Sequence, residues 1–269
     1  MMNTFYAVFL GIVQGLTEFL PISSSGHLAL FEHFVGLKEA GLGFDIMLHL
    51  GTFLAIVIYF RKDWWEMAAA LLPRNDPQTR HSRRLLIYLA LATLPGGFFG
   101  WLLEERAETT FRGPALIAAN LAVAGLILIL AEVFARKSRE FEDISLKDAL
   151  LIGFAQALAV VPGVSRSGIT IAMGLFLGIN RQAAARFSFL LSAPIIFGAG
   201  LNHLVHLYRH GSAGENPAFQ FYLIGLLSAG ISGYLVIKYL LAFLRRHGLY
   251  AFAYYRFLVA GVVFLMVYS

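Results

Sequence analysis

The stretch PGVSRSGIT, residues 162–170, sets an arginine, two serines and a threonine between two apolar runs, LLIGFAQALAVV (150–161) and IAMGLFLGI (171–179). The proline and glycine at its start interrupt a helix, and polar groups at membrane depth are costly unless a partner meets them. The stretch therefore predicts a broken apolar helix whose polar turn faces a partner rather than lipid.

The composition of the whole chain supports a membrane setting. Of the 269 residues, 58% are hydrophobic and 14% are charged, whereas a soluble domain carries about 25% charged residues. The sequence therefore predicts an all-α polytopic membrane protein, with the lipid bilayer as a partner. The net charge of +5 is interpreted as a topology signal, and no nucleic-acid partner is expected. Cysteine is absent, which excludes disulfides and thiolate chemistry.

Six apolar segments are long enough, or nearly so, to cross the roughly 30 Å hydrocarbon layer as helices. They are residues 44–60, 85–103, 114–135, 183–201, 219–244 and 250–268. Two further apolar regions, 5–35 and 148–179, are interrupted in the middle by Pro, Gly and Ser, so each half is too short to cross. Broken helices at membrane depth are tolerated where protein covers them or they line a cavity. We interpret both regions as re-entrant helix–loop–helix hairpins.

The basic residues are distributed unevenly between the predicted loops. Loops 61–84, 136–147 and 245–249 together carry twelve Lys and Arg residues, and the loops on the opposite side carry four. Because cytoplasmic loops are enriched in Lys and Arg, the first group is predicted to be cytoplasmic. Both termini then lie outside.

An internal repeat appears when the chain is shifted by 142 residues. The shift places Gly11, Gln14, Leu16, Ser23, Ser25 and Gly26 on Gly153, Gln156, Leu158, Ser165, Ser167 and Gly168. The sequence thus predicts two halves, 1–135 and 146–269, each a hairpin followed by three spans. Three crossings invert the second half, so the hairpin tips should meet near the middle of the membrane, an arrangement typical of transporters.

The two predicted tips carry the chemistry of an anion site. Serine is a favoured N-cap, and the serines of both tips precede second half-helices, whose N-termini offer free N–H groups and partial positive charge. Phosphate is the natural ligand of such helix ends. Arg166 adds a planar cation suited to phosphate oxygens.

The first tip adds reactive groups. Ser24 is a candidate nucleophile, and His27, three residues later on the same helical face, is the best local candidate for its base. Glu18 and Gln14 share a face of the preceding half-helix; Glu18 could orient His27 or bind Mg²⁺ or Ca²⁺. An alternative pairs Glu18 with Arg166 as a structural bridge. His49 lies in a span without such neighbours, and a structural role is expected for it.

At this point the residues show a family likeness. QGLTEFLPISSSGH (14–27) and PGVSRSGIT (162–170) resemble the two signature motifs of the undecaprenyl-diphosphate phosphatases, the bacitracin-resistance family of bacterial membrane enzymes. The resemblance implies removal of the terminal phosphate from a C55 isoprenyl diphosphate lipid, which recycles the carrier for peptidoglycan and other envelope polymers. It also implies a divalent cation, Mg²⁺ or Ca²⁺, and a multi-pass protein of the bacterial inner membrane whose site opens to the periplasm or cell exterior.

The resemblance also assigns roles to individual residues. It implies that Glu18, Ser24, His27 and Arg166 are catalytic, with Glu18 at the metal, and that the site is lined by Gln14, Ser23, Ser25, Ser165, Ser167 and Thr170. Position 14 is Gln here, where many members of the family have Glu. A mechanism that needs two carboxylates is therefore in doubt for this chain, and Glu18 alone should carry that role.

Two other functions compete with the phosphatase. The inverted repeat also suits a flippase or transporter of polyprenyl phosphate lipids, and a structural protein of the envelope machinery would leave the polar residues unexplained. The two tips differ, however, because Glu18 aligns with Val160, His27 with Ile169 and Ser24 with Arg166. This asymmetry favours a reaction over a conduit. The sequence leaves open the chain length of the lipid, the identity of the metal and whether the protein is a homodimer. It also leaves open whether the phosphoryl group passes through a covalent phosphoserine at Ser24 or directly to water, and whether the protein also flips lipid.

Overall fold

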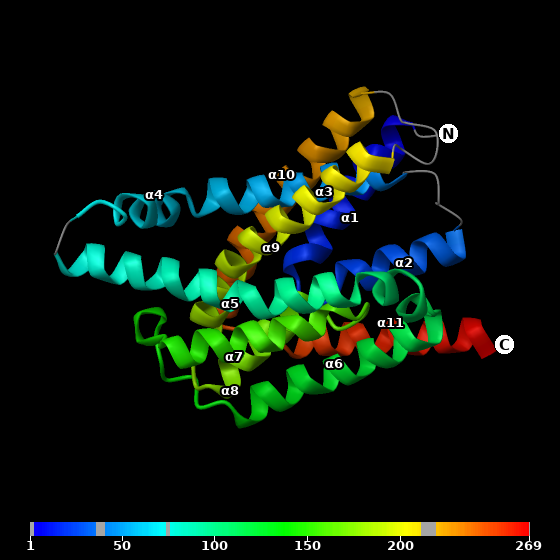
Figure 1. Ribbon diagram of the computed structural model, residues 1–269. Coiled ribbons are helices and arrows are strands. Elements are labelled where there is room, and N and C mark those ends of the chain that lie inside the picture. Colours follow the sequence, from blue (N-terminus) through cyan, green and yellow to red (C-terminus); the bar gives the residue numbers. More distant parts are fainter. Residues whose placement is uncertain (1–2, 36–40, 74–75, 211–218, 269) are drawn as a thin grey trace.

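The computed structural model describes residues 3–35, 41–73, 76–210 and 219–268, and its regular elements are helices (Figure 1). The first half contains α1 (Thr4–Phe19), α2 (Ser24–Val35), α3 (Gly41–Tyr59), α4 (Arg61–Ala69), α5 (Pro77–Glu108), η2 (Thr110–Arg112) and α6 (Pro114–Phe134). The second contains η3 (Phe141–Asp143), α7 (Leu146–Ala157), η4 (Leu158–Val160), α8 (Arg166–Phe176), α9 (Arg181–His210), α10 (Phe219–Leu244) and α11 (Tyr250–Tyr268). The predicted all-α membrane fold is confirmed.

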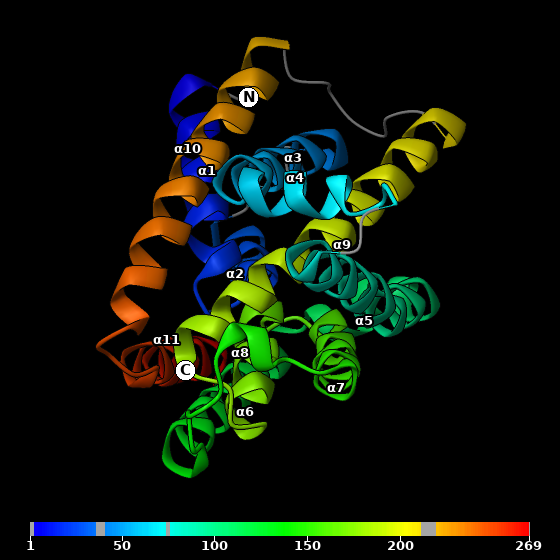
Figure 2. The same ribbon diagram turned by 90° about the vertical axis from the view of Figure 1, so that its left-hand side faces the viewer.

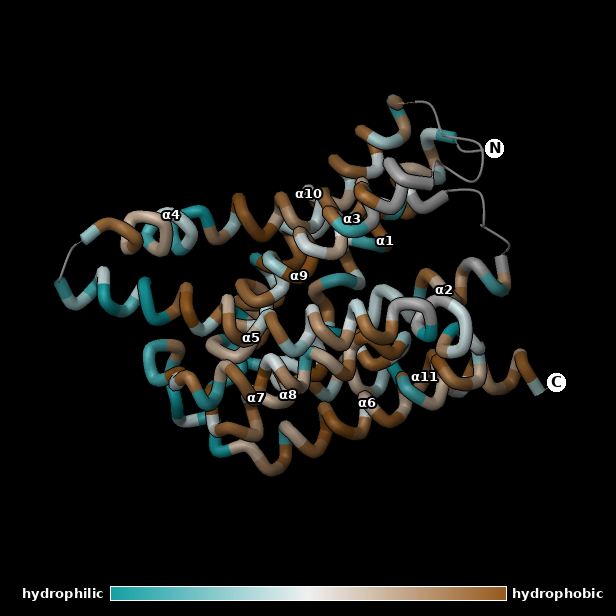
Figure 3. Tube along the Cα trace, viewed as in Figure 1, coloured by the Kyte–Doolittle hydropathy of each residue, from teal (hydrophilic) through white to brown (hydrophobic). Residues whose placement is uncertain are grey.

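Five of the described helices, α5, α6, α9, α10 and α11, are long and apolar enough to cross a membrane. The sixth predicted span, 44–60, corresponds to α3, which bends by 72° into α4; the two pass the same test as a bent pair. Large apolar side chains such as Phe98, Phe197 and Leu258 remain more than half exposed. Figure 3 shows hydrophobic residues along much of the long helices and hydrophilic ones gathered at the end that holds α4 and the start of α5. The protein is therefore a multi-pass membrane protein.

The loop predicted over 61–84 is largely helical, which corrects that expectation. Its first part forms α4, and its last part is the start of α5, which begins at Pro77. Asp76 caps α5 by accepting hydrogen bonds from the backbone N–H of Thr79 at 2.9 Å and from its hydroxyl at 2.7 Å. The apolar pattern predicted only residues 85–103 of this helix. Apolar residues indicate the part of a helix that lies in lipid, and the helix itself extends beyond it.

The two predicted hairpins are present and enter from opposite ends of the molecule. In Figure 1, α1 runs inward from the end where the chain termini lie and α2 returns there, while α7 runs inward from the end that holds α4 and α8 returns to it. Their tips meet in the middle. Figure 2, viewed along that direction, places α2, α8 and α9 between the α1–α10 pair and the α5–α7 pair.

Each hairpin packs mainly on a helix of the other half. Helix α1 lies against α10, and α7 lies against α5. Small residues allow these close approaches. A Cβ added at Gly11 of α1 would lie 2.7 Å from the carbonyl oxygen of Gly225, and one added at Gly153 of α7 would lie 2.4 Å from that of Ala92. Gly11 and Gly153 are 142 positions apart, so they occupy equivalent places in the predicted repeat. The boundaries of its two halves stay a prediction.

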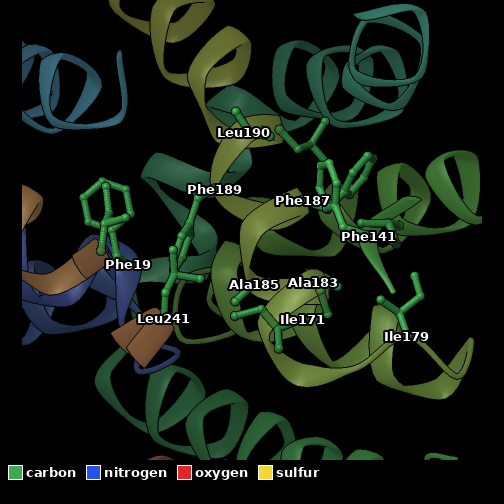
Figure 4. Close-up of a cluster of buried hydrophobic side chains, with 14 of the residues drawn as sticks. Phe19, Phe141, Ile171, Ile179, Ala183, Ala185, Phe187, Phe189, Leu190 and Leu241 are labelled. Atoms are coloured by element: carbon green, nitrogen blue, oxygen red, sulfur yellow. The ribbon is translucent and has the colours of Figure 1, made fainter. Parts of the chain in front are cut away.

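The apolar core lies around α8 and α9 and adjoins the first tip. Phe187, Phe189 and Leu190 of α9 are fully buried in it, as is Ile171 of α8 (Figure 4). The ring of Phe19, at the end of α1, packs edge-on against Phe189 with 5.5 Å between their centroids. The end of the first half-helix is thus anchored to the helix behind the second hairpin.

Candidate active site

The two tips share one backbone device. Ser23 and Ser165 both have positive φ, 79° and 72° respectively, a conformation that costs a residue with a side chain about 1–3 kcal/mol. Each serine then caps the half-helix that follows. The Ser23 hydroxyl accepts from the Gly26 N–H at 3.3 Å, and the Ser165 hydroxyl accepts from the Gly168 N–H at 3.1 Å. The expected N-caps are therefore present at both tips.

The tips contact each other directly. The N–H of Gly163 in the second tip donates to the Ser23 hydroxyl in the first at 3.1 Å. In return, the Ser167 hydroxyl donates to the carbonyl oxygen of Leu20 at 3.0 Å. Within the first tip, the Ser25 hydroxyl lies 3.5 Å from the Ser23 hydroxyl. Within the second, the Ser165 hydroxyl lies 3.2 Å from the Ser167 hydroxyl. Ser23 and Ser167 thus join the two tips, and each of the other two predicted lining serines contacts one of them within its own tip.

A carboxylate connects the reactive groups of both tips. One oxygen of Glu18, Oε2, accepts from the Ser24 hydroxyl at 2.8 Å and from the Gln14 amide at 3.1 Å. Its other oxygen, Oε1, accepts from Arg166 Nη2 at 2.7 Å. The side chains of Glu18 and Arg166 are only 9% and 11% exposed. The structure therefore brings Gln14, Glu18, Ser24 and Arg166 together, as expected.

Helix α9 supports Arg166 from behind. Arg166 Nη1 donates to the carbonyl oxygen of Ser188 at 3.3 Å. The Thr170 hydroxyl, which donates to the carbonyl oxygen of Arg166 at 2.7 Å, lies 2.7 Å from the Ser188 hydroxyl. Thr170 therefore holds the helix that carries Arg166 and faces α9. Sequence reasoning missed Ser188, which sits in an apolar span with no motif around it.

His27 differs from expectation in its partners. Its Nδ1 lies 2.7 Å from the carbonyl oxygen of Ser23, so in the neutral ring this nitrogen carries the proton. Its Nε2 lies 2.8 Å from the Tyr255 hydroxyl and accepts from it. Both ring nitrogens are therefore engaged away from Ser24. The expected arrangement, in which His27 is the base for Ser24 and Glu18 orients His27, is corrected: Glu18 itself accepts the Ser24 hydrogen bond.

Three residues of the spans adjoin the site without having been predicted for it. Tyr255 and Arg256 of α11 contact the first tip through His27 and through the carbonyl oxygen of Pro21. His49 of α3 lies within electrostatic range of the Glu18 carboxylate, although a purely structural role was expected for it. Of the three, only Arg256 offered a signal in the sequence, because a charged residue within an apolar span by default indicates function.

The oxygen donors at the first tip can contribute to a divalent-cation site. The Gln14 side-chain oxygen is buried without a partner in the described part of the structure, next to the Glu18 carboxylate and the Ser24 hydroxyl. No group of three His, Cys, Asp or Glu side chains among the described residues could hold a metal. One carboxylate, an amide oxygen and a hydroxyl at the tip could instead contribute to holding an ion such as Mg²⁺, which is commonly bound by one or two carboxylates together with substrate phosphates.

Taken together, the groups at the tips suit phosphoryl transfer. Helices α2 and α8 both begin there, and helix N-termini bind phosphate. Arg166 provides paired donors, and a serine hydroxyl donates to a buried carboxylate, which is the arrangement of a nucleophile with its base.

Comparison with known proteins identifies the family. The family model described as bacitracin resistance protein BacA matches residues 7–262. The chain belongs to this family. Curated relatives include proteins named undecaprenyl-diphosphatase from Rubrobacter xylanophilus (46% identical, covering 98% of each chain) and Moorella thermoacetica (47%, covering 97% of each). Another, from Gemmatimonas aurantiaca, is 45% identical and covers 98% of this chain and 97% of its own. The family suggested by the two motifs is thereby confirmed.

Proposed function

We propose that this chain hydrolyses undecaprenyl diphosphate to undecaprenyl phosphate and inorganic phosphate, and thereby confers bacitracin resistance. The observation that carries the proposal is the chain of contacts from Ser24 to Glu18 to Arg166, which joins a nucleophile, a base and a phosphate-binding cation from two hairpins. The near full-length relatives named undecaprenyl-diphosphatase support the substrate. A site between hairpin tips also leaves the isoprenyl tail in hydrocarbon while the diphosphate reaches the tips.

The reaction proceeds by transfer of the terminal phosphoryl group to Ser24. The Ser24 oxygen forms a bond to the terminal phosphorus, and its proton passes to Glu18 Oε2, 2.8 Å away. The bond from that phosphorus to the bridging oxygen breaks, and the lipid monophosphate leaves. The oxygen of a water molecule then bonds to this phosphorus, and the bond from phosphorus to the Ser24 oxygen breaks. Glu18 returns its proton to the Ser24 oxygen, and inorganic phosphate leaves with both protons of the water. Arg166, held by Glu18 and Ser188, and the helix N-termini stabilise the phosphoryl oxygens.

A divalent cation, Mg²⁺ or Ca²⁺, is part of the proposal. Glu18 would hold it together with the side-chain oxygen of Gln14, which has no hydrogen-bond partner among the described residues. When bound, the cation would neutralise charge on the phosphate oxygens. Because residue 14 is an amide, Glu18 supplies the negative charge at this end of the site.

The proposed setting is the bacterial inner membrane, with the site open to the periplasm or cell exterior. The basic loops support this orientation, since α4, the start of α5 and the α6–α7 loop lie together at one end and the termini at the other (Figure 1).

The test is phosphate release from C55 isoprenyl diphosphate by purified protein in detergent, with and without EDTA. Ser24→Ala should lower the rate by about a hundredfold or more, a barrier change of about 2.7 kcal/mol, and mass spectrometry of rapidly quenched wild-type enzyme should find phosphate on Ser24. Folded wild-type protein that releases no phosphate with added Mg²⁺ or Ca²⁺, yet equilibrates labelled lipid between leaflets, would instead establish the flippase.

A further inference from the structure

A buried arginine of α11 bonds to both hairpin tips. Arg256 is fully buried, with 0% of its surface exposed. Its Nε donates to the carbonyl oxygen of Pro21 in the first tip at 2.5 Å. Its Nη1 donates to the carbonyl oxygens of Gly163 and Val164 in the second tip, at 3.3 and 3.2 Å. One side chain from a third element therefore bridges the two turns that carry the candidate site.

Arg256 has no acidic partner among the residues that the structure describes. Its acceptors are backbone carbonyls that follow the C-terminal ends of α1 and η4, where the helix dipole is negative. Its Nη2 is buried and has no hydrogen-bond partner within the described part of the chain. Burying an arginine without an acidic partner costs stability. Packing alone therefore does not account for an arginine at this position.

We propose that Arg256 is a positioning residue that clamps the two tips together and so sets the geometry of the reacting groups. The contact at risk is the one between Arg166 of the second hairpin and Glu18 of the first, 2.7 Å long, because its length depends on how the tips are held. The planar guanidinium can reach acceptors in both turns at once, whereas the ammonium of lysine is a compact point charge. The kinetic part of this inference rests on the proposed function.

Gly168 offers a second way to disturb the same clamp. A Cβ at this position would lie 2.8 Å from Arg256 Nη2. Alanine there would push the guanidinium away while leaving its charge in place. The next nearest atoms, Cβ and Oγ of Ser165, would lie 3.3 Å away. The change therefore acts first on the end of the Arg256 side chain.

The experiment compares Arg256→Lys and Gly168→Ala with two matched controls. Arg181→Lys removes a guanidinium that bonds to both oxygens of the buried Glu132 at 2.8 and 2.7 Å, in contacts that involve neither tip. Gly97→Ala adds a Cβ with nothing within 4 Å. For each folded, monodisperse protein we would measure Tm, kcat and KM for phosphate release, and amide hydrogen exchange in the two tips.

We expect kcat to fall by about tenfold or more in both clamp variants, about 1.4 kcal/mol in barrier, with KM within about threefold of wild type. Amide exchange should rise in residues 20–28 and 160–170 and not elsewhere. Arg181→Lys should lower Tm while keeping kcat. Gly97→Ala should keep kcat and raise Tm slightly, because alanine favours the helix more than glycine does. Clamp variants that fold and retain wild-type kcat and tip protection would overturn the proposal, as would failure of both to fold. The exchange measurement does not depend on the proposed function, so an inert wild type would refute that function alone.

Discussion

Replacing Glu18 by glutamine keeps the shape of the side chain but removes the negative charge opposite Arg166. Both side chains are close to fully buried, at 9% and 11% exposure, so Arg166 would become an uncompensated buried cation. Removing one partner of a buried ion pair costs about 3–5 kcal/mol. A loss of that size lowers Tm by on the order of 10 °C in a chain of about this size. Arg166→Gln should cost a similar amount, because it strands the carboxylate instead.

The double variant Glu18→Gln, Arg166→Gln decides whether charge pairing is the cause. Two neutral amides leave no stranded charge, so the double variant should be more stable than either single one, with a coupling energy above about 2 kcal/mol. Thermal unfolding in detergent measures all four proteins. Phosphate release should be lost in all three variants, since each single variant lacks either the base or the phosphate-binding cation and the double variant lacks both. The reasoning would be refuted if the stability losses of the two single variants added up to that of the double variant. Decreases in Tm below about 2 °C in the single variants would refute it as well.

Three further changes test the rest of the architecture by thermal unfolding and phosphate release. Gly153→Ala forces a Cβ to within 2.4 Å of a backbone oxygen and should cost about 1–3 kcal/mol; a stability equal to that of the open-space variant Gly97→Ala would contradict the packing described. Tyr255→Phe removes the hydroxyl at His27 Nε2 and should cost about 1 kcal/mol, with turnover reduced by less than about threefold; a tenfold loss would give His27 a larger part. Glu132→Gln should destabilise the protein by about 3–5 kcal/mol, because the Glu132 side chain is fully buried between an Arg and a Lys partner. The folded variant should keep its kcat, because these partners lie outside the tips. Loss of kcat in folded protein would contradict the separation of Glu132 from the candidate site.

The fold and several of the residues that meet at the two tips were readable from the sequence. The clusters of Pro, Gly and Ser in two apolar segments located the hairpins. They divide each segment into halves that are too short to cross the bilayer as helices. The four-residue spacing of Gln14 and Glu18 placed them on one helical face, and they are hydrogen-bonded. These inferences succeeded because each depends on residues close together in the chain.

The division of roles at the site could not be derived in the same way. His27 and Ser24 are near neighbours in sequence, yet the partner that occupies His27 Nε2 is Tyr255, which lies in the last helix. Likewise, the acceptors of Arg256 are carbonyls of two turns far away in sequence. Local spacing does not predict such long-range contacts. In addition, the apolar neighbours of Tyr255 and Arg256 made α11 resemble an ordinary membrane span.

The crossed packing of the hairpins has a consequence for biogenesis. Helix α1 ends at Phe19, while its main neighbour α10 begins at Phe219, and ribosomes add about 5–20 residues per second. The first hairpin is therefore synthesised roughly 10–40 s before the helix that covers it, with the free backbone groups of its broken turn unpaired in the meantime. During that interval the nascent chain needs a sheltered, hydrated place beside the bilayer, which an insertion factor can provide. Quality control of this protein should accordingly act on the complete chain rather than on its early helices.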